Sequence, residues 1–353
     1  MNHSISKELS RSFQFASIIA TVLVIAIHYQ SKYYIVDTTG MNYFVQEFLT
    51  NGLARLAVPY FAFSAGFFFF LKYTGFSSYK LGVKKRISTI FIPYLIASLI
   101  MFLAQYFYIT ILKNNHYPLD ANRLIQDLLL VPVSVQLWFL RDLMFLVLIS
   151  PFIWVISNFA YGIGVGLLGL LWLAEIQVTP LLAGKHVITI ETLFFFSLGA
   201  WLVRYADQFE SVLKAIKPVY KYTLVVCLLF ILVLRVANDP FFIVGYAPSD
   251  YSYTNLLLYK AAILLGVFVV MLVAYGRQFR LTALLASFTF FVYLYHLLPL
   301  SYLVTKLGHL IMPDPYVFYF NFPVAVFFSF TGAYLLSRVM PRLYSIMAGG
   351  RGV

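Results

Sequence analysis

The sequence is short of charged residues. Only 11% of its 353 residues are Asp, Glu, Lys or Arg, whereas 62% are hydrophobic. Ordinary soluble chains carry about 25% charged residues, because their surfaces must be hydrated. The composition therefore excludes a soluble domain with a single packed core and places the chain in a lipid bilayer.

The sequence has a single cysteine and lacks the common catalytic signatures. The single cysteine, Cys227, lies in an apolar run and excludes a disulfide framework. The sequence contains no Gly-x-Ser-x-Gly, no His-Glu-x-x-His, no P-loop and no cysteine cluster. Nothing therefore supports a serine hydrolase, a zinc protease, a nucleoside triphosphatase or a structural zinc site. We expect no metal site and no permanently bound cofactor.

Long apolar runs recur along the whole chain. Runs of about 20 residues suffice to cross about 30 Å of hydrocarbon as helices, and they are too many to belong to one signal peptide. Because they are continuous, they do not match the short alternating strands of a barrel. We predict an all-α, polytopic membrane protein of about ten transmembrane helices, forming one domain over residues 1–353. The helices are expected near residues 12–30, 52–72, 87–112, 134–157, 160–177, 188–205, 222–239, 255–275, 284–305 and 316–338.

The net charge of +12 is explained by orientation in the membrane. If the N-terminus is cytoplasmic, most of the 25 Lys and Arg fall in the segments on that side, which is the asymmetry of the positive-inside rule. We therefore predict that both termini are cytoplasmic. The basic residues then indicate topology, and we expect no nucleic-acid partner.

The first predicted helix carries a polar stripe. Counting back from His28 by seven, eleven and fourteen residues meets Thr21, Ser17 and Gln14, which share one helical face. Such a stripe in a membrane helix faces the bundle interior or a wet cavity. We predict that His28 ends an interior polar track. An interfacial histidine hydrogen-bonded to headgroups or to a loop carbonyl is an equal alternative on this helix alone.

The second predicted helix places Arg55 about one turn inside its boundary, where a charge is expensive. Pro59 cannot donate to the carbonyl of Arg55, so we expect a free acceptor and a kink there. The small residues Ser64, Ala65 and Gly66 allow a neighbouring helix to approach closely. The alternative is that Arg55 extends to the headgroups.

A late helix repeats the pattern. Thr289 and Tyr293 precede His296 by seven and three residues, and Pro299 leaves the carbonyl of Tyr295 without a helical donor. This face should look inward. The predicted topology puts six polar or aromatic side chains at one level, in the outer halves of their helices: His28, Arg55, Trp138, Arg141, Asp142 and His296.

Arg141 and Asp142 are adjacent, so on a helix they point in different directions. We therefore predict separate partners and no mutual salt bridge. Asp142 could orient a histidine. The alternative, rated at least as highly, is a structural ion pair with another helix.

Three stretches, taken with His28, resemble the acyltransferase-3 family of membrane O-acyltransferases. "RLAVPYFAFSAGFF" (residues 55–68) is similar to the family's second-helix signature, "LWFLRDLMFLVLISP" (137–151) to its fourth helix, and "SFTFFVYLYHLLPL" (287–300) to its late Tyr-x-x-His segment. The resemblance covers nearly the whole chain. One position departs from it: many members have an arginine eleven residues before the histidine, where this chain has Ser17.

The resemblance implies an acetyl-CoA or other acyl-CoA donor on the cytoplasmic side. It also implies a hydroxyl of a cell-surface or exported polysaccharide, or of its lipid-linked precursor, as acceptor. We expect a multi-pass protein of the bacterial plasma (inner) membrane, in contact with lipid. The basic run Lys80 to Arg86 could meet the phosphates of coenzyme A, although topology explains the same charges and is preferred.

Acyl transfer to a hydroxyl needs a base and a group that holds the oxyanion. His28 can act as base or acyl carrier, Arg55 can hold the oxyanion or an anionic donor, and His296 completes the predicted catalytic set. We expect the substrate to meet Trp138, Arg141, Asp142 and Tyr293, and an acyl-pantetheine arm to pass along Gln14, Ser17 and Thr21.

Two other functions stay open. Polar paths between kinked helices also suit a transporter or exporter of a lipid-linked sugar or small solute, although no inverted repeat is visible. The departure at Ser17 leaves room for a catalytically silent binding module on the same fold.

Overall fold

The computed structural model describes residues 4–117, 120–182, 185–238, 252–277 and 279–351. Within these residues the chain is helical apart from a short antiparallel hairpin, β1 (Leu181–Leu182) and β2 (Lys185–His186). This agrees with the predicted all-α class. The helices are α1 (Lys7–His28), α2 (Met41–Glu47), α3 (Ala57–Phe70), α4 (Phe76–Arg86), α5 (Ile92–Phe107), α6 (Ala121–Ile125), α7 (Trp138–Leu148), α8 (Ser150–Asn158), α9 (Ile163–Leu173), α10 (Ile190–Leu202), α11 (Ala206–Ala215), α12 (Pro218–Asn238), α13 (Tyr253–Ala274), α14 (Thr282–Tyr295), α15 (Leu300–Ile311), α16 (Val317–Val339) and α17 (Pro341–Met347).

Seven helical segments in the described residues are long and apolar enough to cross a membrane, or up to eight if the bent pair α14 and α15 counts as one span. The predicted number of about ten is therefore not confirmed. The predicted spans 134–157 and 160–177 give way to a single apolar segment, Ser150–Leu173. The predicted span 188–205 contains α10 with only 13 residues, fewer than the about 20 that span a bilayer. The predicted helix 222–239 corresponds to α12, and residue 239 lies outside the described residues.

The predicted helix 284–305 is wrong as a continuous element. α14 ends at Tyr295, α15 begins at Leu300, and the two are bent by 85°. Pro299 has no N–H to donate, so the helical ladder cannot pass through it. His296 therefore lies at the end of α14, where its ring and its backbone carbonyl contact residues of α1 and the residue after it.

The segment before α3 is irregular. π-helical residues 48–52 and a 3-10 turn over residues 53–56 lead into α3, so Arg55 lies in a tight turn. Pro59 falls in the first turn of α3, where a missing N–H costs nothing. The departure from α-helical geometry thus precedes the proline.

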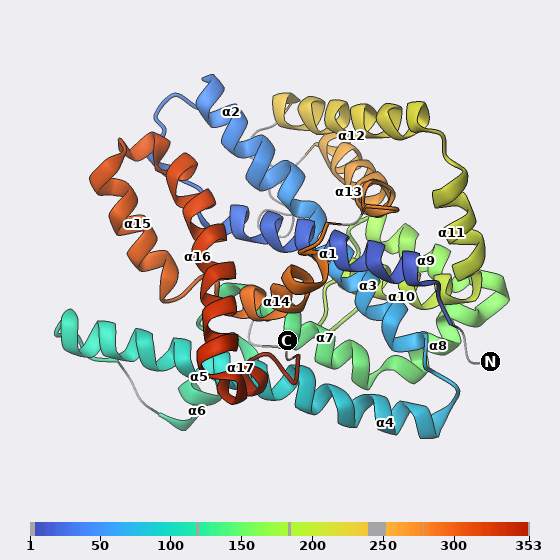
Figure 1. The fold of residues 1–353 in the computed structure, drawn as a ribbon, viewed down its shortest axis with the longest axis horizontal. Helices are drawn as coiled ribbons and strands as arrows, with labels where there is room; N and C mark the ends of the chain where they lie inside the picture. The colour runs from blue at the N-terminus through green and yellow to red at the C-terminus, as the bar shows by residue number, and fades with distance from the viewer. Residues whose placement is uncertain (1–3, 118–119, 183–184, 239–251, 278, 352–353) are drawn as a thin grey trace.

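Helix α1 lies at the centre of the bundle, packed against α3, α13, α14 and α16 (Figure 1). Leu9, Ala16 and Ile25 along it are fully buried. The first predicted helix is therefore surrounded by the elements that carry Arg55 and His296. This central position brings residues from distant parts of the sequence to α1.

Helices α3 and α10 pack with their backbones in close contact. A side chain on Gly66 would lie 2.0 Å from the carbonyl oxygen of Phe196, and one on Gly199 would lie 2.1 Å from that of Phe63. Only glycine fits at such a crossing. The expectation of a close neighbour at Gly66 is confirmed, and the neighbour is α10.

The outer faces of several helices expose large apolar side chains, among them Phe152 of α8, Leu170 of α9, Phe230 of α12 and Phe327 of α16. In water such faces would drive aggregation, whereas hydrocarbon solvates them. Together with the apolar spans, they define a multi-pass membrane protein.

Candidate active site

The two candidate catalytic histidines face each other. His28 ends α1 and His296 follows the last turn of α14, and their ring centroids are 5.2 Å apart. The neighbour of His28 helps to fix this arrangement, because the buried Tyr29 hydroxyl donates to the backbone carbonyl of His296 at 2.6 Å. Sequence reasoning predicted both histidines and missed Tyr29, whose aromatic character does not distinguish it from the 26 other tyrosines.

The tautomer of His296 follows from its contacts. Nδ1 lies 3.1 Å from the carbonyl oxygen of Val292 and 3.0 Å from that of Tyr293. Both partners are acceptors, so Nδ1 carries the proton and Nε2 of the neutral ring carries the lone pair. That Nε2 atom is buried and has no hydrogen-bond partner among the described residues. A fully buried imidazole, with its ring centroid 5.2 Å from that of His28, thus keeps one nitrogen with a free lone pair.

Arg55 lies in the turn over residues 53–56, which packs against α1. Its Nε donates to the side-chain oxygen of Asn51 at 2.9 Å. The guanidinium is half-buried. It is therefore held by a neighbour in an interior position, and it does not match the alternative of a side chain extended to the headgroups.

Asn51 is held in turn by a buried ionic network. Its amide donates to the carboxylate of Glu47, which is paired with Lys32 at 2.6 Å and lies 3.9 Å from Arg235. Arg235 also donates to the backbone carbonyl of Asn51 at 3.0 Å. Glu47 and Arg235 are fully buried. Removing one charged partner from such a buried network strongly destabilises the folded protein, because the remaining charge is left unpaired.

Sequence reasoning missed this network, although a signal was present. Glu47 precedes an apolar run and Arg235 lies inside one, and charges in such runs mark interior partners. What the sequence does not give is the pairing, because α2 and α12 are far apart along the chain.

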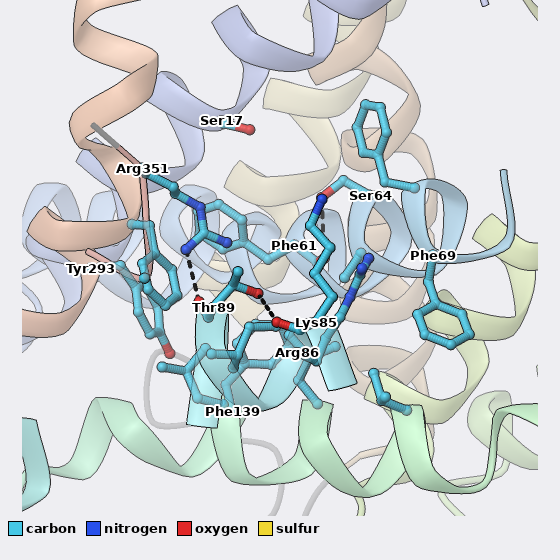
Figure 2. Close-up of a pocket in the computed structure, with 18 of the residues that line it drawn as sticks. Ser17, Phe61, Ser64, Phe69, Lys85, Arg86, Thr89, Phe139, Tyr293 and Arg351 are labelled. Atoms are coloured by element: carbon cyan, nitrogen blue, oxygen red, sulfur yellow. Dashed lines mark hydrogen bonds between the residues drawn. The ribbon is translucent and has the colours of Figure 1, made fainter. Parts of the chain in front are cut away.

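A cavity of about 620 Å³ opens between α1, α3, α4, α7 and α14 (Figure 2). This volume is in the usual range for a small-molecule site. Its wall is mixed, with a cationic part, a hydroxyl-bearing part and an aromatic part. The cations are Lys72, Lys85, Arg86 and Arg351; the hydroxyls are Ser17, Ser64, Thr89, Thr289 and Tyr293; the aromatic rings are Phe61, Phe68, Phe69, Phe139, Phe196 and Phe290.

The predicted donor passage is brought to this cavity in part. Ser17 lines it, and its hydroxyl donates to Phe13 at 2.9 Å and lies 3.3 Å from that of Tyr60. Thr21 is fully buried and donates to the carbonyl of Ser17 instead of lining the cavity. Gln14 is exposed and is not part of the wall. The expectation that all three share an interior path is therefore wrong for Gln14.

Tyr293 belongs to the cavity wall and also lies near His296, with 6.3 Å between the ring centroids, whereas His28, Arg55 and His296 themselves are not part of the wall. Its hydroxyl donates to the carbonyl of Gln136, just before α7. Trp138 is half-buried beside Phe139, at 6.1 Å between ring centroids, and is not part of the cavity wall.

The prediction that Arg141 and Asp142 do not pair is wrong. Arg141 Nη2 lies 2.8 Å from Asp142 Oδ1, and Nε donates to the same oxygen at 3.1 Å. The long arginine side chain folds back along the helix because the fully buried carboxylate requires a cation. The other carboxylate oxygen accepts the N–H of Thr189 at 3.3 Å. Among the described residues, Asp142 therefore bonds to Arg141 and Thr189 and to no histidine.

Comparison with known proteins defines the class. The family model described as the acyltransferase domain of acyltransferase-3 matches residues 12–338. The chain therefore belongs to the acyltransferase-3 family, and it is a membrane acyltransferase. No curated protein and no solved structure matches it.

Proposed function

We propose that this protein is a membrane O-acyltransferase that moves an acyl group, acetyl in the first instance, from acyl-CoA to a hydroxyl of a cell-surface or exported polysaccharide or its lipid-linked precursor. The observation that carries the proposal is the pair formed by His28 and the free Nε2 of His296, beside a cavity that reaches Tyr293. Hydroxyl acylation requires a basic nitrogen near a ligand-sized cavity, and here Tyr293 of the cavity wall lies 6.3 Å from His296 between ring centroids.

In the proposed reaction His28 takes the proton of the acceptor hydroxyl as its oxygen attacks the thioester carbon. The resulting imidazolium can donate to Nε2 of His296, which is free to accept. Arg55 holds the oxyanion, because its guanidinium is always charged and is fixed by Asn51. The thioester C–S bond breaks, a C–O ester bond forms, and the proton leaves on the coenzyme A thiol.

The cavity supports a donor that enters from the side of α4. Lys72, Lys85 and Arg86 line it at one end and belong to the segment predicted to be cytoplasmic. Within the basic run, Lys85 and Arg86 line the cavity, whereas Lys80 stacks over Phe76 at 4.7 Å. Two residues of that run therefore line the cavity, the exposed Lys85 and the half-buried Arg86, which favours a role in donor binding beyond topology. In this orientation both termini are cytoplasmic, in a bacterial plasma membrane.

The test is to incubate the purified protein in nanodiscs with radiolabelled acetyl-CoA and extracted envelope glycans. Transfer of label to glycan supports the enzyme. Flux of a lipid-linked sugar into vesicles without transfer of label supports the transporter. Binding without either result leaves the silent binding module and removes the proposed chemistry.

A further inference from the structure

The cavity has a cationic end without a carboxylate. Lys72, Lys85, Arg86 and Arg351 line it, and no Asp or Glu does so in the part of the chain that the structure describes. Arg86 and Arg351 are half-buried. Like charges repel more strongly where water is scarce. A bound anion would remove this repulsion.

A turn that contains two glycines brings Arg351 to the cavity. After α17, Gly349 and Gly350 adopt φ values of +64° and +77°, which other residues rarely adopt. A side chain on Gly349 would lie 2.3 Å from the carbonyl oxygen of Thr89. The segment 348–351 therefore lies directly against Thr89, and the two glycines direct Arg351 inward.

The guanidinium of Arg351 is fixed but only partly used. Nη1 donates to Thr89 at 3.0 Å and to Ala348 at 3.1 Å, and the group stacks on Phe290 at 3.8 Å. Nε and Nη2 donate to no residue within the described ranges. Burial, followed by the charge of Arg86, lowers the pKa of Arg351 from its ordinary value to about 10, so the group stays charged at neutral pH. Its two free donors form a fork that matches a phosphate.

We propose that segment 348–351 closes the cationic end of the cavity and that Arg351, together with Arg86, binds a phosphate group of the ligand. Figure 2 shows Arg351 on one side of Thr89 and Lys85 and Arg86 on the other, all lining the same space. Assigning this phosphate to coenzyme A rests on the function proposed above. An anionic lipid headgroup is the other source of the same chemistry.

The experiment compares wild type with Arg351→Gln in nanodiscs. Coenzyme A affinity is measured by calorimetry, and acetyl transfer is measured with acetyl-CoA and with acetyl-pantetheine, which has no phosphate. Arg351→Gln should weaken coenzyme A binding about 10-fold or more, since hydrogen bonds to charged groups are lost. It should raise KM for acetyl-CoA by a similar factor and leave kcat/KM for acetyl-pantetheine unchanged. Phosphatidylglycerol binding is measured in parallel, in nanodiscs with and without that lipid.

Arg338→Gln is the matched control, because Arg338 also stacks on an aromatic ring, Tyr334 at 5.4 Å, but is exposed and outside the cavity wall. If Arg351→Gln weakens phosphatidylglycerol binding alone, the phosphate site stands and its source is lipid. Equal affinity of wild type and Arg351→Gln for both probes overturns the proposal, as does an equal loss with acetyl-pantetheine. If wild type binds coenzyme A but transfers no acyl group, the function proposed above fails while the phosphate site is still tested by binding.

Discussion

His28 and His296 lie with ring centroids 5.2 Å apart, one at the end of α1 and the other at the break between α14 and α15. The contact comes from the packing of α1 against α14, whose last turn directly precedes His296, and it lies beside the 85° bend between α14 and α15. Tyr29, the residue after His28, stabilises this contact because its hydroxyl donates a hydrogen bond to the backbone carbonyl of His296. Two imidazoles from opposite ends of the sequence therefore form one site.

Replacing His28 with Ala should lower acyl transfer at least about 100-fold, because a positioned base contributes that much or more. The half-buried ring makes no hydrogen bond within the described residues, so its loss should leave the melting temperature nearly unchanged. Transfer rate and thermal unfolding are measured on the same preparation. An active variant would remove His28 from the mechanism.

The variant His296→Asn tests the role of Nε2 in His296 separately from that of Nδ1. The asparagine amide can still donate to the carbonyls of Val292 and Tyr293, as Nδ1 does, but it has no nitrogen at the position of Nε2. We expect kcat to fall about 100-fold with little change in KM for the donor. If kcat is unchanged, the free Nε2 has no role in the reaction.

Arg55→Lys keeps the charge and loses the planar guanidinium. Since the bond from Nε to Asn51 fixes the group, a lysine should hold the oxyanion poorly and lower kcat about 100-fold. Arg204→Lys is the control, because Arg204 is exposed and stacks on Trp154 at 5.7 Å. Full activity of Arg55→Lys would show that only the positive charge at this position matters.

Ser17 tests the route of the donor. It lies about 16 Å along α1 from His28 at 1.5 Å per residue, and it lines the cavity. A Ser17→Cys variant should be labelled by a thiol reagent confined to the cytoplasmic side, and acyl-CoA should block the labelling. Ser17→Trp should weaken acyl-CoA binding without affecting the acceptor. A thiol that is unreachable from that side, in a variant that still transfers acetyl groups, contradicts this route.

Gly66→Ala tests the crossing of α3 and α10. The added carbon would lie 2.0 Å from a backbone oxygen, so the helices must separate, at a cost of about 1–3 kcal/mol or more. Gly332→Ala, where nothing lies within 4 Å, is the matched control and should unfold like wild type. The comparison is made by thermal or chemical unfolding in the same detergent. Equal stability of the two variants would mean that the crossing is less tight than described.

The sequence by itself determined the membrane class, most of the spans and the interior placement of His28 and His296. Continuous apolar runs have one physical solution in a bilayer, because every backbone polar group must be satisfied within its own helix. The polar residues His28, Arg55, Ser17 and His296 were predictable for the same reason, since their cost in lipid requires an interior place. Helical spacing did less well for Gln14, which is exposed. Helical spacing shows that polar residues share one face of a helix, but it does not show along what length neighbouring helices bury that face.

Only the tertiary structure decided which interior groups meet. The Arg141–Asp142 pair forms because a buried carboxylate requires a cation, and side-chain length overrides helical spacing. Glu47 joins Lys32 and Arg235 through packing of α2 and α12, and Arg351 enters the cavity through the glycine turn after α17. The contacts of Glu47 with Arg235 and of Arg351 with Thr89 connect residues far apart along the chain. Periodicity within one helix carries no information about such contacts, because helix crossings and turns set the pairing.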